Sequence, residues 1–141
     1  MANNKIKLTT TTQEKKLNHK HEKTLPHNHS IDDCEDLLIE AMPPVSTVET
    51  VADALKQLGD PNRLRIFWLL CHCEECVINI ASLMEMSSPA VSHHLKLLKI
   101  SGLIVSKRHG KEMFYKAADT AIVDKLHHTI EEIAEITCPK R

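Results

Sequence analysis

Three cysteines stand close together near the middle of the chain, at Cys71, Cys73 and Cys76, and Cys138 comes close to its end. Thiolate sulfur is the ligand that soft and borderline metal ions prefer. Three converging sulfurs suit cadmium, lead, copper(I) or arsenite, whereas four suit zinc or cadmium. We therefore expect a soft-metal site here, with Cys138 and the upstream Cys34 as competing additional ligands.

Other interpretations of these cysteines stay open. Buried free cysteine is common, so Cys71 and Cys76 could be small apolar residues at helix ends. Three cysteines within six residues is an unusual density for that role, and it favours the metal site. The thiols could also form a disulfide on oxidation, which would make the chain a redox sensor. His72 is a possible substitute ligand, but we expect it to face solvent.

A second group of residues has the chemistry of a DNA-binding helix. Ser88 is expected to cap this helix, with Pro89 at its first position. Helical spacing places an apolar stripe on one face, made of Val91, Leu95 and Leu98. The opposite face is short and polar, as contact with base edges in a major groove requires. We assign to DNA contact Ser88, Ser92, His93 and Lys96.

Two runs rich in strand-forming residues come next, at residues 103–108 and 112–116. They flank the turn signal at residues 109–111 and so predict a β-hairpin. Between residues 87 and 116 there are six basic residues and a single acid, a formal charge of +5 in a chain whose net charge is −1. Such a local patch favours contact with DNA phosphates. We expect Lys107, Arg108 and Lys111 to make these contacts.

Further helices must position these residues. Ser46 is expected to begin one helix with a capping box, and Asp60 with Pro61 to begin the next. Residues 77–84 form the first helix of a helix-turn-helix, and its buried residues are expected to be Ile78, Ile80, Ala81 and Leu83. The predicted fold is mainly α with a small β-hairpin, a winged helix-turn-helix.

A long apolar stripe marks the last helix, which Asp119 is expected to cap. Its members are Ile122, Val123, Leu126, Ile130, Ile133 and Ile136. A single small domain has little left for this stripe to cover, so we expect a homodimer formed through N- and C-terminal helices. Two-fold symmetry also suits the half-sites of a double-stranded operator.

Charge changes sharply along the 141 residues, with a formal +4 on residues 1–30 and a formal −8 on residues 31–86. We predict a disordered tail at residues 1–30, an acidic helix or extension at 31–44, and the DNA-binding and dimerisation domain at 45–138. The tail's histidines bind metal weakly or are merely compositional; they are His19, His21, His27 and His29. No apolar run reaches the roughly 20 residues of a membrane span and no signal peptide pattern is present, so we expect a cytoplasmic protein without membrane contact.

From about residue 46 to 136 the sequence resembles the ArsR/SmtB family of metal-responsive winged-helix repressors. Four blocks carry the likeness, in the family's order: residues 58–66, 75–81, 87–95 and 110–115. The resemblance implies a homodimeric repressor that sits on operator DNA and leaves it when a metal or metalloid ion binds. Nothing in the sequence indicates an enzyme.

The family's metal ligands carry over only in part. One family site uses a Cys-Val-Cys run, which this chain matches at Cys76 but not at Ile78, and Cys34 resembles a ligand from the N-terminal extension. Another family site lies on the last helix, where the matching positions are Asp119, Ala121, Glu132 and Glu135. Because Ala121 stands where histidine is expected, metal binding by the other three is left open.

The predicted function is therefore transcriptional repression, with release from the operator when a thiophilic ion binds the cysteine-rich site. A thiol-redox-sensing repressor on the same scaffold is one alternative. A metal-handling protein with no DNA-binding role is another, and the basic hairpin argues against it.

Overall fold

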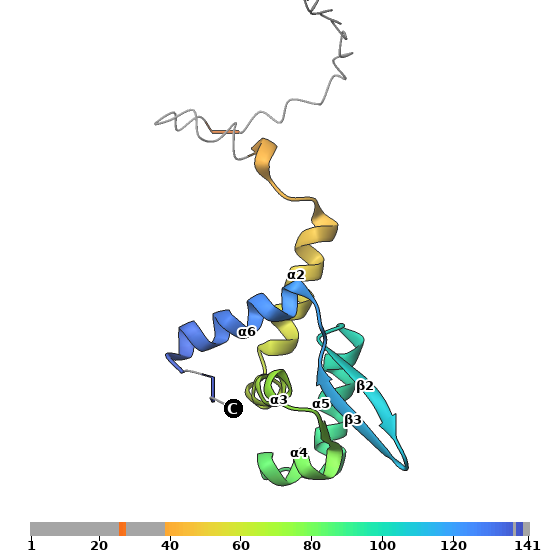
Figure 1. The fold of residues 1–141 in the computed structure, drawn as a ribbon. Coiled ribbons are helices and arrows are strands. Elements are labelled where there is room, and N and C mark those ends of the chain that lie inside the picture. Colours follow the sequence, from red (N-terminus) through yellow and green to blue (C-terminus); the bar gives the residue numbers. More distant parts are fainter. Residues whose placement is uncertain (1–25, 28–38, 137, 140–141) are drawn as a thin grey trace, which may run out of the picture. The chain divides into compact units, whose positions relative to one another are not determined.

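The computed structural model describes residues 26–27, 39–136 and 138–139, and it divides the chain into two compact units, residues 1–41 and 42–141. Cys34 and the tail histidines other than His27 lie outside the described residues. In the first unit, residues 39–41 are helical. The second unit holds all the elements labelled in Figure 1.

The second unit combines helices with a small antiparallel sheet. The elements are α2 (Val45–Leu58), α3 (Pro61–His72), β1 (Glu75–Cys76), α4 (Val77–Met84), α5 (Ser88–Ile100), β2 (Ile104–His109), β3 (Glu112–Ala117) and α6 (Ala121–Ala134). The sheet order is β1-β3-β2. This arrangement, with the helix pair α4–α5 followed by the β2–β3 hairpin, confirms the predicted winged helix-turn-helix (Figure 1).

The first two helices of this unit begin in different ways. Asp60 caps α3 as predicted: its carboxylate accepts a hydrogen bond from the backbone N–H of Arg63 at 2.9 Å, and Pro61 opens the helix. The capping box predicted at Ser46 is wrong. α2 begins one residue earlier, at Val45, and has no side-chain cap, so Ser46 lies inside the helix.

The caps of α5 and α6 each lie one residue from the predicted position. Ser87, not Ser88, caps α5, and Thr120, not Asp119, caps α6. Both have the extended backbone that an N-cap needs, and both hydroxyls accept a backbone N–H three residues on. In each case the extended backbone is found at the neighbour of the predicted residue, and that neighbour is therefore the N-cap.

A compact turn leads from α5 into the hairpin. Gly102 has a φ of +73°, a left-handed conformation that costs glycine little. This conformation lets the Leu103 N–H donate to the Leu98 carbonyl at 3.0 Å, which closes the helix end in a Schellman motif. β2 and β3 then pair as far as His109 with Glu112, leaving a two-residue turn at Gly110 and Lys111.

A third strand, β1, pairs with β3 and was not predicted. It is two residues long, with Glu75 opposite Tyr115 and Cys76 opposite Phe114. Two residues are too few to show the alternating pattern from which a strand is predicted. The strand attaches the hairpin to the segment that begins α4.

The core lies between α3, α4, α5 and the hairpin. Its largest fully buried side chains are Phe67, Ile66, Ile80, Leu95, Leu98, Leu103, Ile104 and Val91. α3 contributes Ile66, Phe67 and Leu70 and is therefore central to this core. No helix in the described residues is long and apolar enough to cross a membrane.

The burial of α4 differs from the prediction. Ile80 and Ala81 are buried as expected, but Ile78 is 66% exposed and Leu83 56%. The face that packs on the core also includes Val77 and Met84, which are partly buried. Positions 77, 80, 81 and 84 follow the helical repeat, and positions 78 and 83 fall outside it.

Two isoleucines of α4 therefore make a matched test of the core. Ile80→Ala should lower the free energy of unfolding by about 2–5 kcal/mol, because it leaves a cavity at a fully buried position. Ile78→Ala, the same change at an exposed position, should stay within about 0.5 kcal/mol of the unchanged protein. Urea unfolding followed by circular dichroism measures both. Equal losses would contradict the orientation of α4.

Candidate DNA-binding surface and metal-ligand cluster

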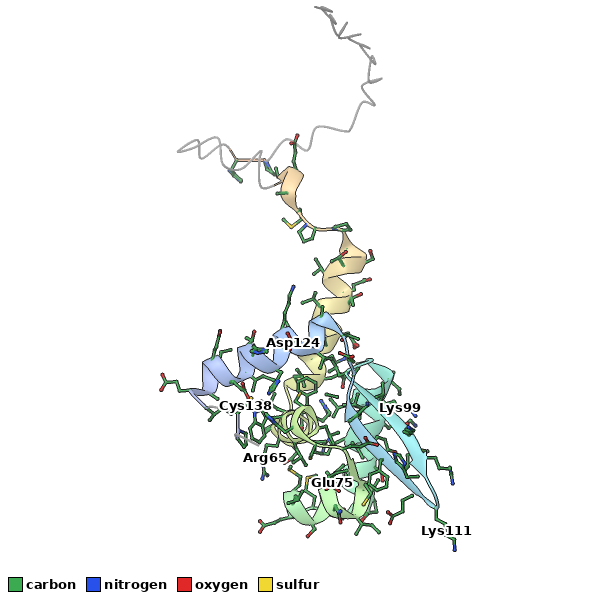
Figure 2. All side chains as sticks on the ribbon, in the orientation of Figure 1. Arg65, Glu75, Lys99, Lys111, Asp124 and Cys138 are labelled. Atoms are coloured by element: carbon green, nitrogen blue, oxygen red, sulfur yellow. The ribbon has the colours of Figure 1, made fainter. Side chains whose placement is uncertain are left out.

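One face of α5 and the β2–β3 hairpin carry the residues predicted to contact DNA. α5 packs Val91, Leu95 and Leu98 into the core and turns its other face outward. All of the predicted residues are exposed: Ser88, Ser92, His93, Lys96, Lys107, Arg108 and Lys111. Figure 2 shows Lys111 at the tip of the hairpin, pointing away from the helices. The structure thus leaves these side chains accessible on neighbouring elements.

A polar contact connects the two elements of this surface. The Lys99 ammonium on α5 donates a hydrogen bond to the hydroxyl of Ser106 on β2 at 2.6 Å. Both residues lie close to the Schellman turn, so the helix and the hairpin are joined by the backbone and by a side chain at the same place. The hairpin therefore has a defined position beside α5.

His94 lies at the edge of α5 rather than on its outer face. It is partly buried, and its Nδ1 has no hydrogen-bond partner among the described residues. Burial lowers the pKa of His94, although the nearby Asp60 carboxylate acts in the opposite direction. A neutral, packed ring suits a structural role, and His93 is the exposed histidine of the pair.

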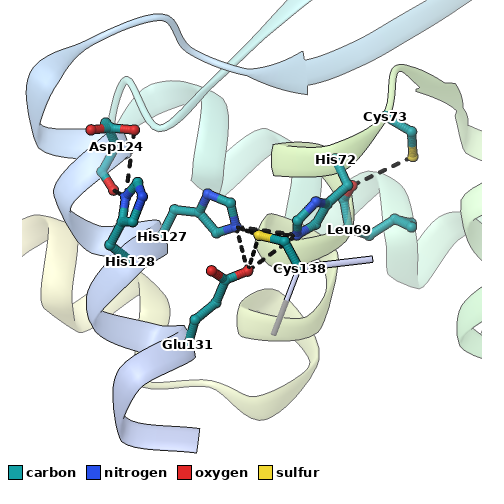
Figure 3. A network of polar contacts seen from close by, with 8 residues as sticks. All are labelled: Leu69, His72, Cys73, Asp124, His127, His128, Glu131 and Cys138. Atoms are coloured by element: carbon teal, nitrogen blue, oxygen red, sulfur yellow. Dashed lines mark hydrogen bonds and ion pairs between the residues drawn. The ribbon is translucent and has the colours of Figure 1, made fainter. Parts of the chain in front are cut away.

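A second cluster lies where the end of α3 meets α6. His72 ends α3, His127 and Glu131 belong to α6, and Cys138 follows that helix (Figure 3). His127 and Glu131 are four residues apart, so both project from one face of the helix. The His127 and Glu131 side chains are only 14% and 12% exposed. Three segments of the chain thus place two imidazoles, a carboxylate and a thiol together.

The four side chains present one atom each to a common centre. His127 Nε2 lies 3.1 Å from His72 Nε2 and 2.9 Å from Glu131 Oε1. Glu131 Oε1 lies 3.5 Å from His72 Nε2. Cys138 Sγ lies 2.6 Å from Glu131 Oε1, 3.6 Å from His127 Nε2 and 3.9 Å from His72 Nε2. We call these four residues the His-Glu-Cys cluster.

Hydrogen bonding inside the cluster shifts two ionisable groups. The Cys138 thiol donates to the Glu131 carboxylate, which raises the pKa of Cys138 and is the main cause of the lowered pKa of Glu131. The two facing imidazole nitrogens can share a single proton, since a hydrogen bond between them needs one donor and one acceptor. The cluster therefore has lone pairs that point inward.

Aromatic packing supports the cluster. The Trp68 ring lies 4.5 Å from the His72 ring, and the His72 ring lies 4.7 Å from that of His127 in an edge-on arrangement. The neighbouring His128 is exposed, and its ring nitrogen contacts the backbone carbonyl of Asp124 on another side of α6 (Figure 3). The orientation of the two clustered imidazoles is thus fixed by packing.

The other cysteines that the structure describes are not part of this cluster. Cys71 is partly buried, and burial raises the pKa of its thiol to about 12. The Cys73 thiol donates to the Leu69 carbonyl at 3.4 Å, and Cys76 is buried at the start of α4. Within the described part of the chain, Cys71, Cys73 and Cys76 do not bring their sulfurs into one ligand group. The predicted cysteine site, including Cys34, stays a prediction.

The sequence missed most of the His-Glu-Cys cluster. Cys138 was among the predicted ligands, but His72 was expected to face solvent, which is wrong, and His127 and Glu131 were not singled out. The spacing of four between the last two was a usable signal. The family's positions on the last helix, Asp119, Glu132 and Glu135, are exposed and do not join the cluster.

Comparison with known proteins identifies the family. Residues 60–106 match the family described as bacterial regulatory protein, arsR family. The HTH-type transcriptional repressor SmtB of Mycobacterium tuberculosis is 30% identical over 111 residues, which cover 75% of this chain and 82% of that protein. The chain belongs to the ArsR/SmtB family. The resemblance seen in the sequence is thereby confirmed.

Other members of the ArsR/SmtB family extend the comparison. A cadmium resistance transcriptional regulatory protein, a CadC homolog of Staphylococcus aureus, is 34% identical over 90 residues, covering 61% of this chain and 74% of that protein. The homodimeric winged helix-turn-helix DNA-binding domain Mb0332 of Mycobacterium bovis has a TM-score of 0.58 at 30% identity and covers 64% of this chain and 82% of its own. As a member of this family, the chain is a transcriptional regulator and not an enzyme.

The pKa of His94 gives a testable dependence of stability on pH. Burial lowers the pKa of His94 below its ordinary 6.5, so as pH falls the unfolded chain takes up a proton before the folded protein does. The folded state is therefore destabilised below about pH 6.5. His94→Asn should reduce the loss of unfolding free energy between about pH 7 and pH 5.

Urea unfolding at the two pH values measures this effect. The exposed neighbour provides the control. The charge of His93 is the smallest of the causes that lower the pKa of His94, so His93→Asn should change the pH dependence much less than His94→Asn does. If His93→Asn and His94→Asn change it equally, burial of His94 is not its cause.

Proposed function

We propose that the chain is a homodimeric repressor that binds operator DNA through α5 and the β2–β3 hairpin and is released when a metal ion binds. The observation that carries this proposal is the outward face of α5, which is polar along the side opposite its buried stripe and lies beside a basic hairpin. A helix of this kind enters the major groove, and the hairpin's cations meet the phosphates.

The side chains of α5 and of the β2–β3 hairpin suit different contacts with DNA. Ser88, Ser92 and His93 are short and lie near the start of α5, which is the end that approaches base edges in helix-turn-helix proteins. Lys107, Arg108 and Lys111 lie on the hairpin, where their charge suits phosphates. We therefore assign base contact to the helix and phosphate contact to the hairpin.

Apolar side chains outside the core support the homodimer. On α2 the exposed members are Val48, Val51 and Leu55; the others, on α6 and just after it, are Ile122, Ile133 and Ile136. The three residues of α2 follow one helix face, and an exposed apolar face is expected to pack on another protein surface. A second copy of the chain fits best, because two-fold symmetry presents two α5 helices to two half-sites. The related Mb0332 domain is itself homodimeric.

The proposed response to metal is supported by the ligand chemistry of the chain and by the name of a related protein. The chain contains cysteines and histidines that could hold a soft or borderline ion, and a relative is named for cadmium resistance. Release from DNA requires a coupling free energy between the two sites, so the ion must bind more weakly to the protein on DNA than to the free protein. Thiol oxidation gains no support at Cys71, because its raised pKa keeps it in the unreactive protonated form.

Fluorescence anisotropy tests the proposal directly. Reduced, full-length protein is titrated onto a labelled DNA duplex from upstream of its own gene, and the complex is then titrated with zinc, cadmium, cobalt, lead, copper(I) or arsenite. Release by one or more of these ions at stoichiometric concentrations supports the proposal. Tight binding that none of them changes would contradict the metal response, and absence of sequence-specific binding would contradict the repressor.

Variants of the DNA-binding surface should separate its two kinds of contact. His93→Ala should weaken binding to the operator about tenfold while changing binding to unrelated DNA little, because it removes a base contact. Lys111→Ala should weaken binding to both sequences and reduce the slope of log affinity against log salt by about one, because it removes a phosphate contact.

A matched lysine provides the control for these variants. Lys125 is exposed on α6, outside this surface, and Lys125→Ala should leave both the affinity and the salt slope unchanged. Equal effects of Lys111→Ala and Lys125→Ala would mean that general charge, not the hairpin, attracts DNA.

A further inference from the structure

We infer that His72, His127, Glu131 and Cys138 of one protomer together form the binding site for a borderline divalent ion of the zinc, cadmium and cobalt class. This inference rests on the proposed function and deepens it, because it names the ligands and the chemical class of the metal. It also replaces the run of three cysteines as the site of metal binding. The spacing of the ligand atoms, their chemistry and their packing support it.

The spacing of the ligand atoms is close to that of a tetrahedral site. Zinc binds nitrogen and oxygen at about 2.0–2.2 Å and sulfur at about 2.3 Å, so ligand atoms at the corners of a tetrahedron lie about 3.3–3.6 Å apart. All six distances among the four atoms of the His-Glu-Cys cluster fall between 2.6 and 3.9 Å. Shifts of a few tenths of an ångström at most corners, and of about 1 Å at the Cys138–Glu131 edge, produce that tetrahedron.

The chemistry of the ligands suits the same class of ion. Two imidazoles, one carboxylate and one thiolate are all ligand types that zinc accepts. Glu131 and a deprotonated Cys138 together carry two negative charges, which balance a divalent cation. Copper(I) and arsenite favour sites rich in sulfur, and a single thiol does not provide one. The ligand set therefore selects divalent ions of intermediate softness.

The packing around the cluster also holds its ligand side chains in place. Its histidine and glutamate side chains are largely shielded from solvent, and the rings of Trp68, His72 and His127 pack against one another. Side chains already held in place lose little conformational entropy when they bind a ligand. His128, next along α6, lies at the surface with its ring nitrogen on a backbone carbonyl, and so serves as a matched control.

The location of the ligands indicates how the ion acts. They come from the end of α3, from α6 and from the segment after α6, so a bound ion fixes the second half of α6 against α3. α6 also carries part of the exposed apolar surface that we assign to the homodimer. Metal binding within each protomer therefore acts on the position of the dimer contact, and through it on the spacing of the two α5 helices.

Cobalt(II) is the probe that tests the ligand set. Full-length, reduced protein titrated with cobalt(II) should show the visible bands of a tetrahedral site and the ultraviolet band of a thiolate bound to cobalt, saturating at one ion per protomer. Cys138→Ser should abolish the thiolate band, and His127→Gln should weaken cobalt binding at least about tenfold. The control variants Cys73→Ser and His128→Gln should match the unchanged protein. Circular dichroism confirms that each variant is folded.

The possible outcomes separate this ligand set from the proposed function. A thiolate band that survives in Cys138→Ser and disappears in Cys73→Ser or Cys76→Ser overturns the inference in favour of the cysteine run. If the variants lose cobalt as expected but the metal-loaded protein still binds DNA as tightly as the metal-free protein, the ligand set stands and release by metal is wrong. If metal releases Cys138→Ser and His127→Gln from DNA at the same dose as the unchanged protein, release stands and this ligand set is wrong.

Discussion

The burial of α3 is the interaction on which both functional surfaces depend. Ile66, Phe67 and Leu70 belong to the core on which α5 packs, and without them that helix has no support for its outward face. The same helix ends in His72, which faces α6. One buried element thus supports the DNA-binding surface along its length and the His-Glu-Cys cluster at its end. A change in the packing of α3 therefore affects both the DNA-binding surface and the His-Glu-Cys cluster.

Local sequence signals were sufficient for most of the fold. The cap at Asp60, the apolar stripe of α5 and the turn at Lys111 each specify their element within a few residues, so the helix-turn-helix and its hairpin could be predicted. Errors arose where two adjacent residues could perform one role. Ser87 and Ser88 are both capable caps, and only the backbone conformation decides between them. β1 was missed because it exists only through its pairing with β3.

The cluster could not be predicted in the same way. His72 and His127 are 55 residues apart, and nothing in either neighbourhood requires the other. The density of cysteines between residues 71 and 76 favoured a metal site made of sulfur ligands. In the fold, those three side chains lie in different surroundings. Proximity along the chain is a good guide to ligands on one loop. It is a poor guide where a helix end meets a distant helix, because only tertiary packing determines that meeting.

The pairing of β1 with β3 has a mechanical consequence. Pairing of Cys76 with Phe114 fastens the hairpin to the start of α4, while Lys99 and Ser106 fasten it to α5. The α4–α5 helix pair and the β2–β3 hairpin are consequently a single stiff body, because the hairpin is attached to both α4 and α5. A stiff body of this kind cannot change its fit to DNA by bending α4, α5 or the hairpin separately. The release from DNA that we propose would therefore turn this body as a whole at the dimer contact, and such a rotation moves the tip of the hairpin furthest.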